Sequence, residues 1–126
     1  MNVGTDICAV RKGVVVDLKS DGTKAGLKDE YLSEGNYIVI RHSDSSFAGY
    51  WHLMQNGVDV AIGDTVTQGQ KIGRSGHTGY SAFPHLHFML YEFQNGIRKT
   101  IPLRFKTSRG VRYLRPGNRY RAVSMD

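Results

Sequence analysis

Short apolar runs alternate with glycine-rich turns along the chain, and nearly every apolar run has the length of a strand. Residues 7–10, 13–18, 36–42 and 47–53 are rich in β-branched and aromatic side chains and are separated by polar segments. Residues 85–93 alternate apolar and polar side chains and end at Asn95-Gly96, a dipeptide typical of hairpin turns. No segment repeats apolar residues with the 3.6-residue period of a helix. The pattern therefore predicts an all-β fold.

The turns between these runs predict how the strands are connected. The runs 36–42 and 47–53 form a hairpin, and 65–73 form a strand, a turn and a second strand. We expect two further strands at 100–105 and 110–114, and the longest loop at 19–35. Many short strands with glycine turns favour a sheet, sandwich or barrel. We expect one domain over residues 1–126, with a basic strand extension at 98–126.

Composition narrows the class of protein. The chain has 126 residues, of which 40% are hydrophobic and 22% charged, as in a globular domain. No apolar run approaches the length of a membrane span, and no signal peptide is visible at the start. The single cysteine, Cys8, cannot form an internal disulfide, and we expect it to be a buried strand residue.

Positive charge is concentrated at the C-terminal end. The net charge is +6, yet residues 1–97 hold 8 basic and 10 acidic side chains, whereas residues 98–126 hold 9 basic side chains and one acidic one. Such a segment can contact a polyanion, or it can be the solvated face of an ordinary hairpin. Tyr113 and Tyr120 lie among its arginines, but no nucleic-acid fold motif occurs, so nucleic-acid binding is disfavoured.

Histidines are the candidate chemical groups: His42, His52, His77, His85 and His87. In a strand, His85 and His87 point to the same face. The pair suits two ligands of one metal, or one ligand beside an acid/base group, but it also suits a simple polar face. His52 ends an apolar strand, where an imidazole needs a hydrogen-bond partner or a catalytic task.

Several motifs occur together in a fixed order. Tyr50-Trp51-His52-Leu53 precedes a segment of the form V-x-x-G-x-x-V-x-x-G-Q-x-I-G at 60–73. Ser75-Gly76-His77-Thr78-Gly79 and Pro84-His85-Leu86-His87-Phe88 follow. With these motifs the chain resembles the lysostaphin-type, or LytM-like, zinc metallopeptidases, and the likeness covers nearly its whole length. The resemblance implies a large antiparallel sheet overlaid by a smaller one, with a groove at the sheet end.

The same resemblance implies an activity and residue roles. The family cleaves peptidoglycan peptides outside the cytoplasm with one zinc ion, so we expect an envelope or secreted location. His87 corresponds to a zinc ligand, and His85 and His52 to catalytic histidines that flank the attacking water. His42 and His77 fall at positions that are not catalytic. The loop 19–35 and the turn 74–83 would wall the groove, with Tyr50, Tyr80 and Phe83 as lining.

One departure concerns the metal. The family's other two zinc ligands lie in an H-x-x-x-D motif just before the segment that Gly4-Thr5-Asp6 resembles, and only three residues precede Gly4 here. This leaves three explanations: a gene start placed too far downstream, a degenerate family member, or a truncated remnant. The first and third are favoured because His52, His85 and His87 are all present. For the chain as given we expect impaired activity and no stoichiometric zinc.

Three alternatives to a peptidase can be weighed against the sequence, and two of them are disfavoured. One is a non-catalytic module of the same fold that binds the cell wall or regulates another wall enzyme. Its basic 98–126 segment would contact an anionic wall polymer. Another is the nucleic-acid binding considered above. The last, a lipoyl-type carrier suggested by residues 60–73, is disfavoured because no lysine stands at the required turn position.

Overall fold

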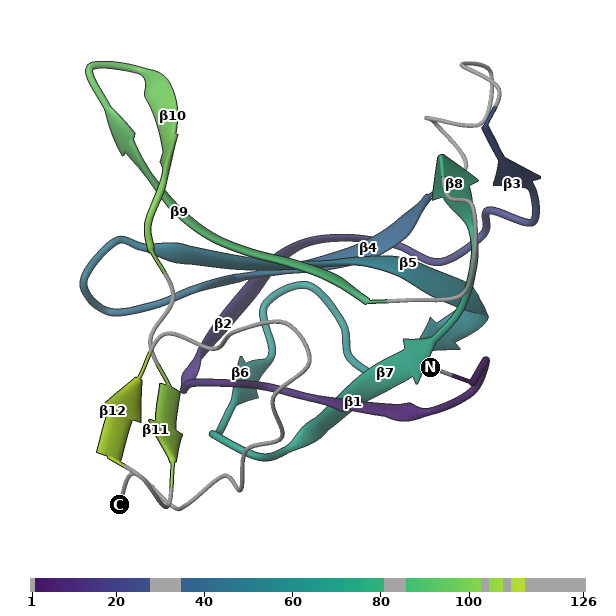
Figure 1. Ribbon diagram of the computed structural model, residues 1–126, viewed down its shortest axis with the longest axis horizontal. Helices are drawn as coiled ribbons and strands as arrows, with labels where there is room; N and C mark the ends of the chain where they lie inside the picture. Colours follow the sequence, from purple (N-terminus) through teal and green to yellow (C-terminus); the bar gives the residue numbers. More distant parts are fainter. Residues whose placement is uncertain (1, 28–34, 81–85, 103–104, 108–109, 113–126) are drawn as a thin grey trace.

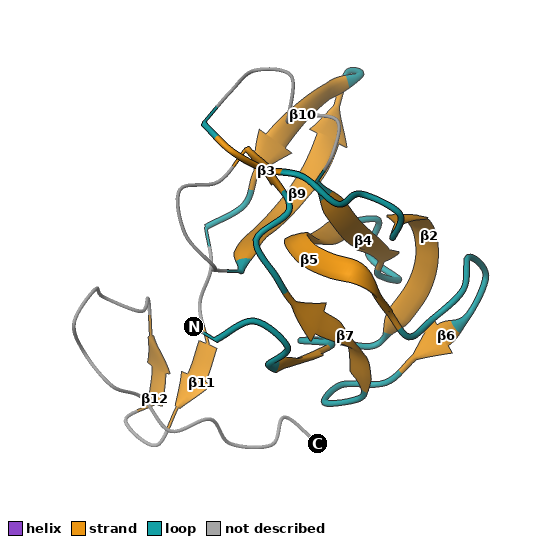
Figure 2. Ribbon diagram, turned by 90° about the vertical axis from the view of Figure 1, so that its right-hand side faces the viewer, coloured by secondary structure: helices purple, strands orange, loops and turns teal. Residues whose placement is uncertain are grey.

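A computed structural model of the chain describes residues 2–27, 35–80, 86–102, 105–107 and 110–112. These residues form strands and connections (Figure 2), with no helix that could span a membrane among them. The strands are β1 (Asp6–Cys8), β2 (Gly13–Lys19), β3 (Ala25–Gly26), β4 (Asn36–Arg41), β5 (Phe47–Val58), β6 (Thr65–Val66), β7 (Lys71–Ser75), β8 (Gly79–Tyr80), β9 (His87–Gln94), β10 (Ile97–Thr100), β11 (Phe105–Thr107) and β12 (Gly110–Arg112).

One antiparallel sheet dominates the molecule. Its strands follow the order β1-β7-β5-β4-β2-β6, and β9 also pairs with β5 and carries β10 as a hairpin. β3 and β8 form a small parallel pair, and β11 and β12 a separate hairpin. In Figure 1 the β9–β10 hairpin and the β3–β8 pair rise on the same side of the sheet, at opposite ends. The all-β, antiparallel fold predicted from the sequence is confirmed.

β5 is the central strand and changes its partner midway. Residues 47–51 pair with β9, whereas Leu53 and Val58 pair with β7. On its other edge β5 pairs with β4, where the register shifts between Asn36 and Tyr37. The change of partner therefore falls between Trp51 and Leu53, at His52.

The core lies on the face of the sheet toward β1, β6 and β7 (Figure 1). Alternate residues of β2, β4 and β5 point into it, among them Val15, Ile38, Ile40, Ala48 and Tyr50, each at most 1% exposed. Burial of these side chains provides the main stabilising free energy of such a fold. Because the core takes one face, the opposite face is left for other contacts.

Three sequence predictions are wrong in detail. Cys8 is exposed, because the burial pattern of β1 turns Ile7 inward and its neighbours outward. The strand expected at 100–105 is interrupted, since β10 ends at Thr100 and the segment Ile101-Pro102, where proline has no N–H to donate, is not a strand. The expected loop 19–35 contains β3. Most of the basic 98–126 segment lies outside the described residues.

Candidate active site

His52 occupies a β-bulge. Its φ is +66°, in the left-handed region that a bulky residue seldom adopts. At this point the pairing moves by two residues along β5 but by only one residue along β4. Tyr50 and Leu53 are both buried in the core although they are three positions apart, so a regular two-residue alternation cannot place both inward. The bulge takes up the extra residue. It leaves His52 as the side chain that turns away from the core.

A backbone carbonyl orients the His52 ring. Nδ1 of His52 lies 2.7 Å from the carbonyl oxygen of Thr78. A carbonyl oxygen only accepts hydrogen bonds, so Nδ1 carries the hydrogen. In the neutral ring the lone pair is then on Nε2. This is the tautomer that a proton acceptor at Nε2 requires.

Thr78 is itself fixed by a buried network. Its hydroxyl donates to the Leu53 carbonyl at 2.5 Å and accepts from the Asn36 backbone N–H at 3.0 Å. The Asn36 side chain donates to the same Leu53 carbonyl and to the Gly22 carbonyl, and accepts from the Gly22 N–H. Asn36 is fully buried, and Thr78 is 7% exposed. These bonds join β4, β5 and the segment before β8 around the carbonyl that holds His52.

Glycine is required next to this carbonyl. Gly79 has a φ of +87°, and a Cβ added there would lie 2.7 Å from Cα of Gly35 and 3.4 Å from Nδ1 of His52. Any other residue would therefore combine backbone strain with a clash against main chain. The glycine lets the segment after Thr78 pass close to the His52 ring.

His87 faces His52 across the boundary between β5 and β9. It begins β9 and pairs in register with Trp51. The centroids of the His52 and His87 rings are 5.9 Å apart, with an angle of 23° between their planes. The His87 side chain is exposed. The structure thus brings together two of the three histidines predicted for the site, while His85 lies outside the described residues.

Aromatic side chains border the histidine pair. The Trp51 ring is 5.5 Å from the His87 ring and 6.4 Å from the Tyr37 ring. It lies over Gly49, where an added Cβ would stand 2.1 Å from the indole. Tyr37 donates its hydroxyl to Asp17 at 3.1 Å, and partial burial raises the pKa of this phenol. Sequence reasoning assigned no role to Tyr37 or Trp51.

Two of the remaining sequence predictions can be compared with the structure. Tyr50 does not line a groove: it is 1% exposed, and its hydroxyl accepts the Val10 N–H at 3.0 Å. Burial raises its pKa to about 12. His42 is buried, with its Nδ1 2.8 Å from the Lys12 carbonyl oxygen, as suits a structural residue. The side chains of Tyr80 and Phe83 lie outside the described part of the chain.

The residues present fit part of a zinc site. Imidazole nitrogen is a preferred zinc ligand, and an exposed His87 can supply one. A catalytic zinc usually takes three protein ligands. Within the described ranges no group of three or more His, Cys, Asp or Glu side chains could hold a metal ion.

Comparison with known proteins gives the class. The signature of Peptidase family M23 matches residues 1–99, and the chain belongs to this family. It is 36% identical over 112 residues to lysostaphin of Staphylococcus simulans, and 42% identical over 99 residues to the peptidoglycan DD-endopeptidase ShyC of Vibrio cholerae. These alignments cover 87% and 77% of this chain but only 20% and 19% of the relatives, so the chain spans about a fifth of their length.

The fold agrees with this assignment. The catalytic domain of lysostaphin from Staphylococcus simulans superimposes with a TM-score of 0.58 at 35% identity, over 79% of this chain and 69% of that domain. The catalytic domain of a point mutant of EnpA, a prophage-encoded M23 protein from Enterococcus faecalis, gives a TM-score of 0.60 at 27% identity, over 79% of this chain and 68% of that domain. The lysostaphin-type resemblance predicted from the motifs is therefore confirmed at the level of family and fold.

Proposed function

We propose that this chain forms part of a zinc-dependent endopeptidase that cleaves peptide bonds of peptidoglycan, with His87 as a metal ligand and His52 and His85 as catalytic histidines. The observation that carries the proposal is the His52–His87 pair, set by a bulge and a buried hydrogen-bond network in a chain of Peptidase family M23. One relative, ShyC of Vibrio cholerae, is named as a peptidoglycan DD-endopeptidase, which supports peptidoglycan as the substrate class. An envelope or secreted location is part of the same proposal.

His52 is suited to accept a proton. The Thr78 carbonyl holds Nδ1 as a donor, so Nε2 is the basic atom. An imidazole titrates close to neutral pH and can therefore take a proton from water and return it to a leaving amine. When bound, zinc supplies Lewis acidity toward a peptide carbonyl. Trp51 and Tyr37 provide an apolar border that can position an extended peptide.

The metal role is tested by zinc binding. Equilibrium dialysis of the folded chain against zinc should show weak, substoichiometric binding, since His87 alone binds zinc less tightly than a three-ligand site. His87→Ala should reduce this binding, and His77→Ala, which removes a histidine outside the pair, should not. Equal zinc uptake by the His87→Ala variant and the parent would remove His87 from the ligand set.

The enzymatic role is tested on purified cell walls. The chain joined to an N-terminal segment that restores the H-x-x-x-D motif should release new muropeptides, detected by liquid chromatography and mass spectrometry. His52→Ala in that protein should abolish release while leaving the fold intact by circular dichroism. If the walls bind the protein but their muropeptides stay unchanged, the chain is a wall-binding module and the endopeptidase proposal fails.

A further inference from the structure

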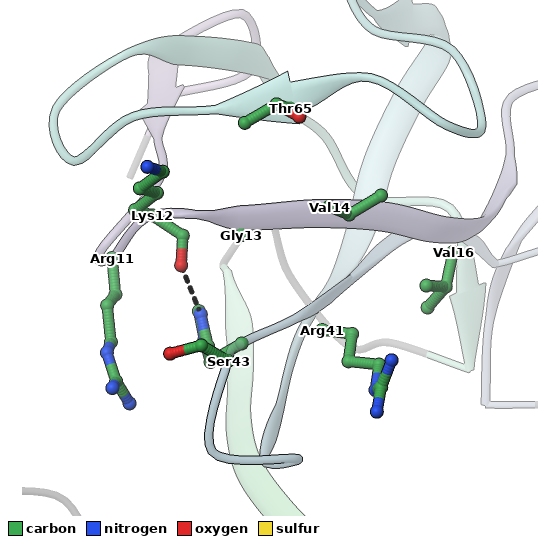
Figure 3. Close-up of a pocket in the computed structure, with 9 residues that line it drawn as sticks. Arg11, Lys12, Gly13, Val14, Val16, Arg41, Ser43 and Thr65 are labelled. Carbon is green, nitrogen blue, oxygen red and sulfur yellow. Dashed lines mark hydrogen bonds between the residues drawn. The ribbon is translucent and has the colours of Figure 1, made fainter.

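A basic pocket lies at the other end of the β4–β5 hairpin from the histidine pair. It has a volume of about 430 Å³ and sits where β2, β4 and β6 meet (Figure 3). Its lining combines cationic side chains, two hydroxyl groups and two partly exposed valines: Arg11, Lys12, Gly13, Val14, Val16, Arg41, His42, Ser43 and Thr65. Three cations from two separate segments therefore share one concavity.

The two arginines of the pocket differ in how far their charge is already compensated. Arg11 pairs with Asp44 at 2.9 Å, and hydrogen bonds to Asp44 from Ser46 and Arg11 keep the pKa of this carboxyl well below its usual range. The contact of Arg41 within the described residues is a 3.4 Å hydrogen bond to Ser45, and it forms no ion pair there. Arg41 is thus the guanidinium best placed to receive an added anion.

Buried contacts fix the shape of the pocket. His42, 2% exposed, holds the Lys12 carbonyl through Nδ1 at 2.8 Å (Figure 3, dashed line). A Cβ at Gly13 would lie 2.5 Å from the Arg41 carbonyl oxygen, so β2 and β4 approach closely at this point. The backbone that carries Arg11, Lys12 and Arg41 is therefore set before any ligand arrives.

The strand register places Arg41 and His87 on the same face of the sheet. Tyr37, Trp51 and His87 form one row of directly paired residues across β4, β5 and β9. Arg41, Phe47 and Tyr91 form the equivalent row four residues along each strand. Residues separated by an even number of positions share a face. This face is opposite to the one that carries the core.

The strand register also gives the distance between the histidine pair and the pocket. Four residues along a strand correspond to ~14 Å, and two strands across to ~10 Å, which gives roughly 17 Å between the Cα atoms of His87 and Arg41. An extended peptide covers this distance with about five residues. The pocket is thus within reach of the substrate on which the histidine pair would act.

We propose that the pocket binds a carboxylate of the peptide substrate. This carboxylate would lie about five residues from the peptide bond that is cleaved beside His52 and His87. This inference rests on the proposed function. Arg41 is the main contact through its guanidinium, with Lys12 adding charge and Ser43 and Thr65 offering hydroxyl donors. Val14 and Val16 take the apolar part of the residue that carries the carboxylate.

Peptide binding with and without the carboxylate tests this assignment. The probe is a soluble peptide dimer released from peptidoglycan, used with its carboxylates free or converted to amides. Trp51, the only tryptophan, reports by fluorescence on binding near His87. Arg41→Gln should weaken binding of the free-acid peptide roughly fivefold and leave binding of the amidated peptide unchanged. The charge-matched control Lys71→Gln, which removes a cation paired with Asp6 and Asp59, should change neither.

The other outcomes are also decisive. Equal binding of both peptides by the parent and by Arg41→Gln would overturn the carboxylate site while leaving the proposed function standing. Absence of any fluorescence response to either peptide would overturn both. Arg41-dependent binding of a glycerol-phosphate oligomer, with free-acid peptide binding unaffected by Arg41→Gln, would assign the pocket to a phosphodiester polymer and refute the peptide assignment.

Discussion

Replacing Thr78 by valine should destabilise the fold around His52 by about 2 kcal/mol. The two side chains have nearly the same shape, so the change removes a hydroxyl with little loss of packing. That hydroxyl donates to the Leu53 carbonyl and accepts the Asn36 N–H. Leu53 keeps a second donor, the Asn36 side chain at 3.2 Å, but the fully buried Asn36 N–H loses the acceptor that it has in the described structure. A buried donor without a partner costs about 1–3 kcal/mol.

Urea unfolding followed by Trp51 fluorescence measures this difference. Thr78→Ser is the matched control, because it keeps the hydroxyl and loses only a methyl group. We expect Thr78→Val to unfold at a clearly lower urea concentration than Thr78→Ser, with the same slope. Equal midpoints for the two variants would refute the reasoning, since the hydroxyl would then contribute no more than the methyl group it accompanies.

Three further predictions concern neighbouring positions. His52→Gly should be more stable than His52→Ala by about 1 kcal/mol in the same urea assay, because both lose the imidazole but only glycine adopts the left-handed backbone without strain. Gly79→Ala should lower the melting temperature, since its Cβ would stand 2.7 Å from Cα of Gly35; an unchanged melting temperature would contradict this. The pKa of Tyr50 is raised to about 12 in the folded chain, so the unfolded chain loses this proton first as pH rises. The free energy of unfolding should therefore fall from about pH 10 upward, and Tyr50→Phe should abolish that part of the loss.

The strands and the family could be predicted because they depend on local patterns. The pattern of hydrophobic residues predicts the first residue of β2, β4, β5 and β9 to within two positions of the first residue in the structure. The ordered motifs pointed to His52 and His87, which the structure places side by side. Both inferences use residues whose spacing is constrained by the strand itself. Neither needs knowledge of which distant segments meet.

Long-range contacts explain what the sequence could not predict. The Thr78 carbonyl meets His52 from 26 positions away, and a carbonyl has no sequence signal because every residue has one. The roles of Asn36 and Tyr37 depend on the register between β4 and β5. The side chain of Tyr50 lies in the core and not in a groove. An aromatic residue next to His52 in the sequence can face either side of the sheet, and only the packed core shows that it points inward.

One signal for the bulge was nevertheless present in the chain. Tyr50 and Leu53 are both apolar and three positions apart, and a regular strand would send them to opposite faces. Both side chains can enter one core only if one residue between them is an additional, bulged residue. The pairing partner of β5 changes from β9 to β7 at the same position. Trp51 keeps its pairing with His87, so the extra residue is His52. The packing of the core therefore positions the histidine, because the same irregular step that lets Tyr50 and Leu53 both be buried turns His52 toward His87.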